Sequence, residues 1–296
     1  MEQDTQNDNP LDMTTRAKDS PWYAHDVAAV LQPQTRSMLQ THANILPDDI
    51  IAHIEVTRSK AWALAPYPSV GALTWLNPYL TLHLSHDLVL EKVKSGATIL
   101  DCACMIAPDL RYLASRGAPA ERMYGFDIEA GFFDIGFDFY RDRERWHGSF
   151  FEADGTKPLS ETKLAVLKGK MDILWCPKFL HLFDRAQQIA VSCNLVGLLR
   201  SVTGSLFIGS QNGRPVPEEM PVKEGSLGHG QNSIFGANAE EMQRMWAEVG
   251  ERTGTKWEVE ARLLDLRTVG LHVEDGSWYK RVTGYNLQWT ARLVEA

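Results

Sequence analysis

From residue 98 onward, short apolar runs alternate with segments whose apolar residues recur every three to four positions. The apolar runs predict strands and the periodic segments predict helices, and their alternation is typical of a parallel sheet with crossover helices. The predicted strands cover 98–103, 123–128, 148–153, 171–176, 205–209, 257–265 and 284–294. The predicted helices cover 108–115, 131–144, 184–199 and 239–249, with Asp184 as an N-cap and Gly250 as the last helix end. The last two strands are expected to form the antiparallel edge found in many mixed sheets.

The pattern is different before the first predicted strand. Residues 1–20 are polar and aperiodic, so they are expected to form a disordered tail. Residues 21–95 have an irregular helical pattern with aromatic residues and prolines, which predicts an N-terminal helical cap. The main domain would then span 96–296. Within it, the segment 211–236 is rich in glycine and proline and is predicted to be a long loop and a candidate lid.

The composition is that of a globular chain and excludes several classes of partner. The 296 residues have a formal net charge of −8 and no block of lysine or arginine, which argues against a nucleic-acid partner. No apolar run approaches the roughly 20 residues needed to span a bilayer, and the N-terminus has no secretion signal. A cytoplasmic location is the default expectation, and a homodimer is compatible with this composition. The cysteines lack zinc-ligand spacing, so no metal is expected.

Three aspartates end successive predicted strands, at the edge where open parallel sheets bind ligands. Asp101 could face a ligand's ammonium group, Asp127 could accept hydrogen bonds from both hydroxyls of a ribose, and Asp154 could accept one from an adenine amine. Together they predict a site for a nucleoside that carries an amine. Taken singly, each aspartate could instead cap a helix or begin a turn.

The turn after the first predicted strand has the outline of a nucleotide-cofactor loop in which other residues replace the glycines. It runs through Ala103, Met105 and Ala107 into a helix opened by Pro108. Glycine normally occupies such positions because the backbone turns tightly and approaches a ligand closely. A negative φ at Ala103 would make the replacement nearly neutral, whereas a positive φ would cost about 1 kcal/mol or more.

Two histidines and a group of aromatic residues are further candidates for substrate contact. His181 follows the fourth predicted strand and could act as a general base, although a histidine in a half-apolar segment is more often a packed structural residue. His229 lies in the 211–236 segment. The aromatic residues of the predicted cap could hold a hydrophobic substrate or pack the cap on the sheet, and they are Trp62, Tyr67, Trp75 and Tyr79.

Several segments, in their order along the chain, resemble the class I S-adenosylmethionine-dependent methyltransferases of fungal secondary metabolism, above all those of meroterpenoid clusters. These segments are 99–104, 109–113, 117–119, 124–127, 139–143, 179–184 and 246–250, and the similarity covers about residues 55–295. The resemblance implies an α/β, Rossmann-like class I methyltransferase fold. In this fold a mostly parallel seven-stranded sheet has an antiparallel edge strand and carries an N-terminal helical cap.

The resemblance also implies S-adenosylmethionine as the cofactor. Asp101 and its turn would face the methionine end, Asp127 the ribose and Asp154 the adenine. The full set of residues assigned to the cofactor is Asp101, Ala103, Asp127, Ile128, Asp154 and Gly155. The residues assigned to the substrate are Tyr67, Trp75, Phe179 and Leu182.

The implied reaction is O-methylation of a carboxylate or phenol on a small hydrophobic, prenylated or polyketide intermediate. A carboxylate needs no base, whereas His181 or His229 could take the proton of a phenol. The chain departs from the family's usual cofactor loop at Ala103, Met105 and Pro108, which makes the loop more apolar and more crowded. This departure motivates an alternative, a methyltransferase-like protein that cyclises or isomerises a terpenoid intermediate without methyl transfer. A non-catalytic binding protein is the third hypothesis.

Overall fold

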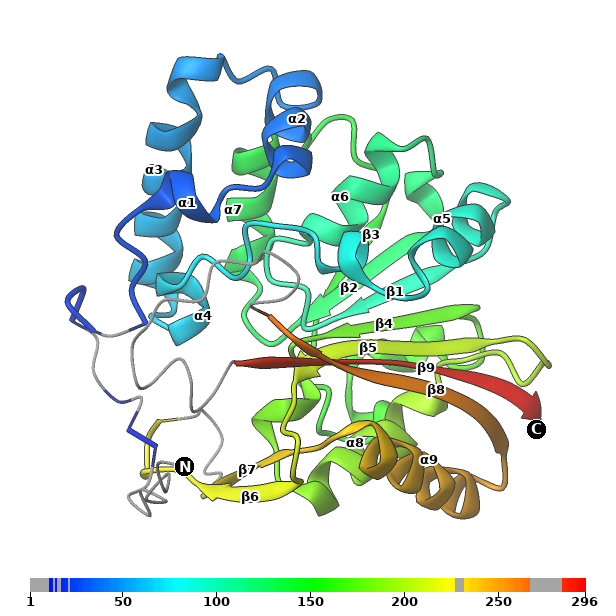
Figure 1. Ribbon diagram of the computed structural model, residues 1–296. Coiled ribbons are helices and arrows are strands. Elements are labelled where there is room, and N and C mark those ends of the chain that lie inside the picture. The colour runs from blue at the N-terminus through cyan, green and yellow to red at the C-terminus, as the bar shows by residue number, and fades with distance from the viewer. Residues whose placement is uncertain (1–10, 13, 15–16, 21, 227–231, 267–283) are drawn as a thin grey trace.

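A seven-stranded sheet forms the centre of the computed structural model, which describes residues 11–12, 14, 17–20, 22–226, 232–266 and 284–296. Its strands are β1 (Ile99–Cys102), β2 (Met123–Asp127), β3 (Ser149–Glu152), β4 (Ile173–Pro177), β5 (Leu206–Asn212), β8 (Lys256–Asp265) and β9 (Tyr285–Glu295). The strand order is β3-β2-β1-β4-β5-β9-β8 (Figure 1). The first five strands in this order, β3, β2, β1, β4 and β5, are mutually parallel. β9 runs antiparallel to both of its neighbours, β5 and the edge strand β8. The expected mostly parallel seven-stranded α/β fold is confirmed.

Helices cover both faces of the sheet, because alternate residues of each strand point to opposite faces. On one face lie α5 (His86–Lys94), α6 (Pro108–Ser115) and α7 (Gly131–Tyr140), and on the other lie α8 (Arg185–Val196) and α9 (Ala239–Thr253) (Figure 1). Along β4, for example, Ile173 and Trp175 pack in the first interface, whereas Leu174 and Cys176 pack in the second. The result is a three-layer sandwich in which the carboxyl ends of the parallel strands share one edge.

The N-terminal helices stand beside α7, on the side of these carboxyl ends (Figure 1). They are α1 (Val27–Val30), α2 (Pro33–Thr41), α3 (Ile50–Leu64) and α4 (Pro68–Gly71). Ile54 and Ala61 of α3 share a buried apolar cluster with Phe132 and Phe139 of α7. Single turns of 3₁₀ helix connect other elements, and they are η1 (Pro47–Asp49), η2 (Tyr79–Leu82), η3 (Ala120–Arg122), η4 (Leu159–Glu161), η5 (Lys163–Leu167) and η6 (Leu180–Leu182). The N-terminal region therefore packs on the main domain through α7.

The segment 211–236, predicted to be a loop, contains regular structure. It completes β5 and then forms an antiparallel hairpin of β6 (Glu218–Pro221) and β7 (Ser233–Gly236). The prediction missed this hairpin because its strands are short and lie among prolines and glycines, which are typical of loops.

The N-terminal residues that the structure describes also differ from the prediction of a disordered tail. Leu11 is only 2% exposed and forms a parallel bridge with Val222, next to β6. Leu11 and Trp22 share a separate apolar cluster with Met220, Val222 and Ile234. The N-terminal segment and the hairpin thus bury each other's apolar side chains.

Capping residues decide where several helices begin and end. Asp184 is the N-cap of α8 as predicted, because its carboxylate accepts a hydrogen bond of 2.7 Å from the Gln187 N–H. α7 ends before the predicted residue 144, since Arg141 adopts the left-handed conformation with φ of 49°. The predicted end of α9 at Gly250 is wrong. The helix continues to Thr253 and is followed by Gly254, whose φ of 68° suits glycine at a helix C-terminus.

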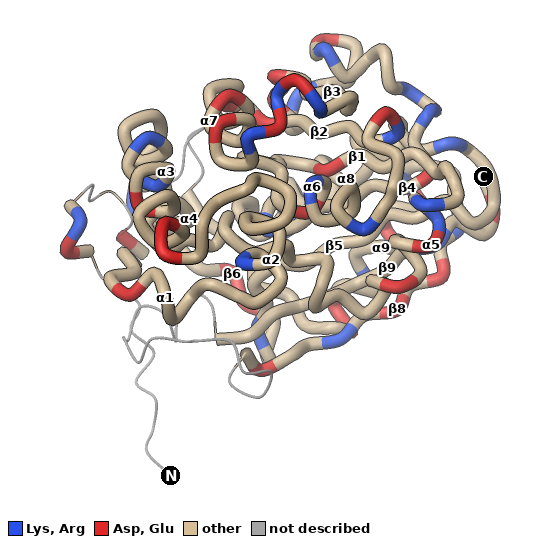
Figure 2. Tube along the Cα trace, turned by 90° about the horizontal axis from the view of Figure 1, so that it is seen from above, with Lys and Arg blue, Asp and Glu red and all other residues tan. Residues whose placement is uncertain are grey.

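Charges of both signs are interspersed along the described chain. Figure 2 shows Lys and Arg beside Asp and Glu around α7. Two of the exposed ion pairs there are Lys60–Asp138, at 3.0 Å, and Arg143–Asp134, at 2.8 Å. None of the described helices combines the length and the apolarity that crossing a membrane requires. The surface around α7 is therefore of mixed charge.

Candidate functional site

The turn between β1 and α6 has left-handed backbone at each position where the sequence suggested a replaced glycine. The φ angles are 56° at Ala103, 48° at Met105 and 51° at Ala107. Left-handed backbone costs an L-residue about 1–2 kcal/mol, because Cβ crowds the following carbonyl oxygen. Of the two outcomes considered for Ala103, the structure has the costly one. The turn therefore keeps the path of a glycine loop although it lacks the glycines.

Replacing Ala103 by glycine should raise the free energy of unfolding by about 0.5–1 kcal/mol, because glycine adopts a positive φ without this crowding. The Ala103 side chain is only half-buried, so little packing is lost. Urea unfolding measures the change. The matched control is Ala114→Gly, at a half-buried position inside α6, which should lose about the same amount. If Ala103→Gly loses stability as the control does, the left-handed geometry is contradicted.

Asp101, at the end of β1, is a buried carboxyl group for which no partner exists among the described residues. Asp101 is 1% exposed, and neither of its carboxylate oxygens accepts a hydrogen bond from the described chain. Burial raises the pKa of Asp101 well above its ordinary value, and the nearby Asp109 carboxyl adds to this effect. A buried carboxylate without a donor is unfavourable. An ammonium group of a ligand would supply the missing partner, so this position fits the methionine end of S-adenosylmethionine.

Asp127, at the end of β2, connects the turn to the second strand. One carboxylate oxygen accepts a hydrogen bond of 2.9 Å from the Met105 N–H, and the other accepts one of 3.0 Å from the Glu129 N–H. Burial raises the pKa of Asp127 to about 6. Each oxygen can accept a second hydrogen bond, as two ribose hydroxyls would require. The neighbouring Ile128 is 40% exposed, so an apolar surface lies beside this carboxylate.

Asp154 and Gly155 follow β3. One oxygen of Asp154 accepts hydrogen bonds from the Thr156 N–H, at 2.9 Å, and from the Thr156 hydroxyl, at 2.6 Å. This is the turn-forming role that the sequence left open for each aspartate. A Cβ atom on Gly155 would lie 2.9 Å from the Phe126 ring and 3.2 Å from the Phe179 ring, so only glycine fits here without movement of the rings.

A second polar group lies at the carboxyl ends of β4 and β5. Lys178, the first residue after β4, has left-handed backbone with φ of 51°. Its Nζ donates a hydrogen bond of 2.8 Å to Oδ1 of Asn212, the last residue of β5, and lies 5.3 Å from the centre of the Tyr79 ring. Burial lowers the pKa of Lys178 to about 7. Sequence reasoning gave no role to Asn212, although it occupies the strand-end position that singled out the aspartates.

His181 lies close to this group, in η6. Its Nδ1 is buried and has no hydrogen-bond partner among the described residues, and the side chain borders a cavity of about 10 Å³ together with Asn212 and Ile234. Burial lowers the pKa of His181 to about 3, and the charge of Lys178 adds to this effect. An imidazole with so low a pKa is a weak proton acceptor, which argues against the predicted role as a general base. The other predicted base, His229, lies outside the described residues.

The aromatic residues predicted to contact substrate lie in different environments. Trp75 is 4% exposed, and its ring packs edge-on against Phe139 at a centroid distance of 5.5 Å. Neighbouring side chains thus cover the ring, so Trp75 packs in the core, and its substrate role stays a prediction. Tyr67 is 37% exposed, at a centroid distance of 6.3 Å from Phe132.

The predicted substrate residues after β4 lie nearer to the strand ends. Phe179 is 8% exposed and packs edge-on against Phe126, at a centroid distance of 6.2 Å. Because Phe126 directly precedes Asp127, this contact links the ends of β4 and β2. Leu182 is half-buried and packs against the core cluster that contains Phe179.

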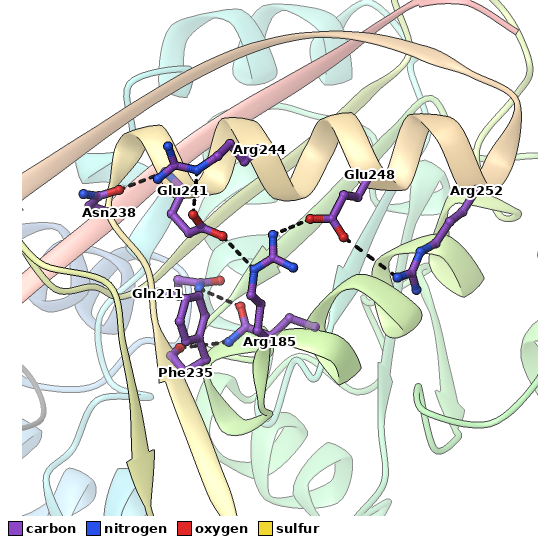
Figure 3. Close-up of polar contacts among 9 residues, drawn as sticks. Arg185, Gln211, Phe235, Asn238, Glu241, Arg244, Glu248 and Arg252 are labelled. Carbon is purple, nitrogen blue, oxygen red and sulfur yellow. Dashed lines mark hydrogen bonds and ion pairs between the residues drawn. The ribbon is translucent and has the colours of Figure 1, made fainter.

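Buried hydrogen bonds tie the hairpin to this edge. The Gln188 side chain of α8 donates to the carbonyl of Phe235, in β7, at 2.9 Å, and Gln211 of β5 donates to Gln188 at 3.4 Å. Figure 3 shows Gln211 and Phe235 beside Arg185, which binds Glu241 and Glu248 of α9. These contacts fix β7 against the end of β5 and next to His181.

Comparison with known proteins agrees with this arrangement. Residues 22–76 match a family model described as the meroterpenoid methyltransferase N-terminal domain. O-methyltransferase phiE of Fungal sp. (strain ATCC 74256) is 33% identical, with 90% of this chain and 84% of the relative covered. O-methyltransferase atr3 of Stereocaulon alpinum is 37% identical, with 83% of this chain and 70% of the relative covered.

A solved structure shares the fold. It is the Burkholderia thailandensis 1,6-didemethyltoxoflavin-N1-methyltransferase with bound 1,6-didemethyltoxoflavin and S-adenosylhomocysteine. It is 14% identical to this chain, and the match has a TM-score of 0.50. The match covers 85% of this chain and 92% of the solved chain. The sheet order, the strand-end residues and the two relatives lead to one conclusion: the chain belongs to the family of fungal O-methyltransferases of secondary metabolism that includes phiE and atr3.

Proposed function

We propose that this protein transfers the methyl group of S-adenosylmethionine to a carboxylate or phenol oxygen of a small hydrophobic secondary metabolite. The observation that carries the cofactor assignment is Asp101, a buried carboxyl group without a partner among the described residues. It is the next-to-last residue of β1, which leads into a turn whose backbone follows a glycine loop. A ligand ammonium group would satisfy this carboxylate.

The other strand-end residues suit the remaining parts of the cofactor. Asp127 would accept hydrogen bonds from the ribose hydroxyls. The exposed side chain of Ile128 would pack against an apolar face of the cofactor. Asp154 and Gly155 would border the adenine. When bound, the cofactor would supply a sulfonium methyl group, whose carbon a nucleophilic oxygen can attack in line with the thioether as leaving group.

The protein contributes mainly by holding the acceptor in line with the methyl group and by excluding water. The buried rings of Phe126 and Phe179 keep the edge between β2 and β4 apolar. A carboxylate acceptor needs no base. The methyltransferase names of the relatives favour methyl transfer over cyclisation or isomerisation without it.

Calorimetric titration with S-adenosylmethionine and, separately, S-adenosylhomocysteine tests this proposal without knowledge of the substrate. We expect one site per chain with micromolar affinity for each ligand. A variant in which an exposed aspartate far from the strand ends is replaced, Asp138→Ala, should bind with unchanged affinity. If neither ligand binds the unmodified protein, the cofactor assignment and the proposed methyl transfer are both wrong.

A further inference from the structure

The amine of Lys178 has a hydrogen-bond acceptor and an aromatic ring as neighbours, but no counter-ion among the described residues. Its Nζ donates to Asn212 at 2.8 Å and lies over the Tyr79 ring at 5.3 Å from the centroid. No described carboxylate lies within ion-pair distance of this amine, and burial alone lowers the pKa of Lys178 to about 7. This environment stabilises the charged form only in part.

Both neighbours are nevertheless of the kind that accommodates an ammonium group. The amide oxygen of Asn212 accepts a hydrogen bond from one of the three N–H groups of Lys178. The negative face of the Tyr79 ring attracts the positive charge. A buried charge without an opposite charge is unfavourable, and supplying the opposite charge relieves this penalty. The remaining N–H groups of Lys178 are therefore suited to an anionic oxygen brought by a ligand.

The position of Lys178 relative to the proposed cofactor site follows from the strand order. β2, β1, β4 and β5 are neighbours in that order, so Asp127, Asp101, Lys178 and Asn212 follow one another along the carboxyl edge of the sheet. Phe179, next to Lys178, touches Phe126, next to Asp127. An oxygen bound by Lys178 would lie beside the cofactor end that Asp101 is proposed to hold.

We propose that Lys178 binds the acceptor oxyanion of the substrate and so selects substrates that present an acidic oxygen. This inference rests on the proposed function. With a carboxylate, no proton moves: the methyl carbon bonds to the oxygen while its bond to sulfur breaks, and the electron pair stays on sulfur. With a phenol, the hydroxyl proton passes to the Lys178 amine before the same displacement. In both cases an ammonium group faces an oxyanion in the reactive complex.

Three probes separate the two sources of the oxyanion. 4-Hydroxy-3-prenylbenzoic acid offers a carboxylate and a phenol, its methyl ester offers the phenol alone, and 4-methoxy-3-prenylbenzoic acid offers the carboxylate alone. Binding of each is measured by calorimetry at saturating S-adenosylhomocysteine, for the unmodified protein and for Lys178→Met, Lys178→Arg and the control Lys163→Met. Lys163 is an exposed lysine paired with Glu152 at 3.1 Å.

We expect Lys178→Met to bind the free acids at least tenfold more weakly, while Lys178→Arg stays within a few-fold of the unmodified protein and Lys163→Met is unchanged. A tenfold loss for the hydroxy acid and its methyl ester, with the methoxy acid bound as by the unmodified protein, would identify the oxyanion as a phenolate. Unchanged S-adenosylhomocysteine affinity shows that each variant is folded. The inference is overturned if Lys178→Met binds all three probes as the unmodified protein does, or if the unmodified protein binds S-adenosylhomocysteine but none of the probes. Failure to bind S-adenosylhomocysteine at all contradicts the proposed function instead.

Discussion

Replacing Asp127 by alanine is expected to weaken S-adenosylhomocysteine binding at least 100-fold, because two hydrogen bonds to a charged group are lost and each contributes about 1.5–3 kcal/mol. The same carboxylate also holds the Met105 N–H at 2.9 Å, in the middle of the left-handed turn. Its removal therefore frees the turn that the cofactor is proposed to contact. Calorimetric titration of the variant measures the loss of affinity.

Two further variants separate charge from shape and from general damage. Asp127→Asn keeps the shape and one acceptor oxygen, so it should lose less affinity than Asp127→Ala. Asp134→Ala removes an exposed aspartate of α7 that pairs with Arg143 at 2.8 Å, and this variant should bind normally. Full affinity in Asp127→Ala would show that the ribose is held elsewhere, and the assignment of the β2 end would be wrong.

The inner part of the sheet could be predicted from sequence because strands such as β1 and β4 are buried on both faces and read as short apolar runs. The helices α6, α7, α8 and α9 could be predicted because their apolar residues recur every three to four positions, whereas α5 lies in the region predicted only as a cap. The hairpin of β6 and β7 could not be, because its apolar side chains pack against Leu11 and Trp22, which are some 200 residues distant. The burial of the Trp75 ring could not be predicted for the same reason, because the ring is covered only when the cap packs on α7.

The candidate site could be predicted in part. The three aspartates followed from a topological rule, because parallel strands bring their carboxyl ends to one edge. Whether each carboxylate has a partner depends on packing, and the three differ: Asp101 has none among the described residues, whereas Asp127 and Asp154 accept backbone hydrogen bonds. Asn212 was missed because it becomes a neighbour of Lys178 only when β5 lies beside β4.

Replacing Arg111 by methionine is expected to lower the free energy of unfolding by about 3–5 kcal/mol, because it removes the arginine counter-ion of the buried Asp142 and leaves this carboxylate with His42 at 3.8 Å. The two side chains are each 1% exposed, and Arg111 Nε donates to Asp142 at 3.1 Å. Burial opposes ionisation of Asp142, but His42 and Arg111 still hold the pKa of this carboxyl below its ordinary value. Urea unfolding gives the free energy, and Arg143→Met, in an exposed ion pair, should change it by less than about 1 kcal/mol.

The double variant Arg111→Met/Asp142→Leu distinguishes the cost of an unpaired charge from the loss of packing. It should regain most of the stability, because apolar residues that replace both members of a buried pair leave no isolated charge. It should not regain cofactor affinity to the same degree, since Arg111 also donates to the Ile106 carbonyl, within the turn, at 2.9 Å. Arg111 is thus expected both to stabilise the α6–α7 region, through Asp142, and to hold the cofactor turn in shape, through the Ile106 carbonyl. Equal losses in Arg111→Met and Arg143→Met would contradict both expectations, because an exposed pair lacks the burial on which they depend.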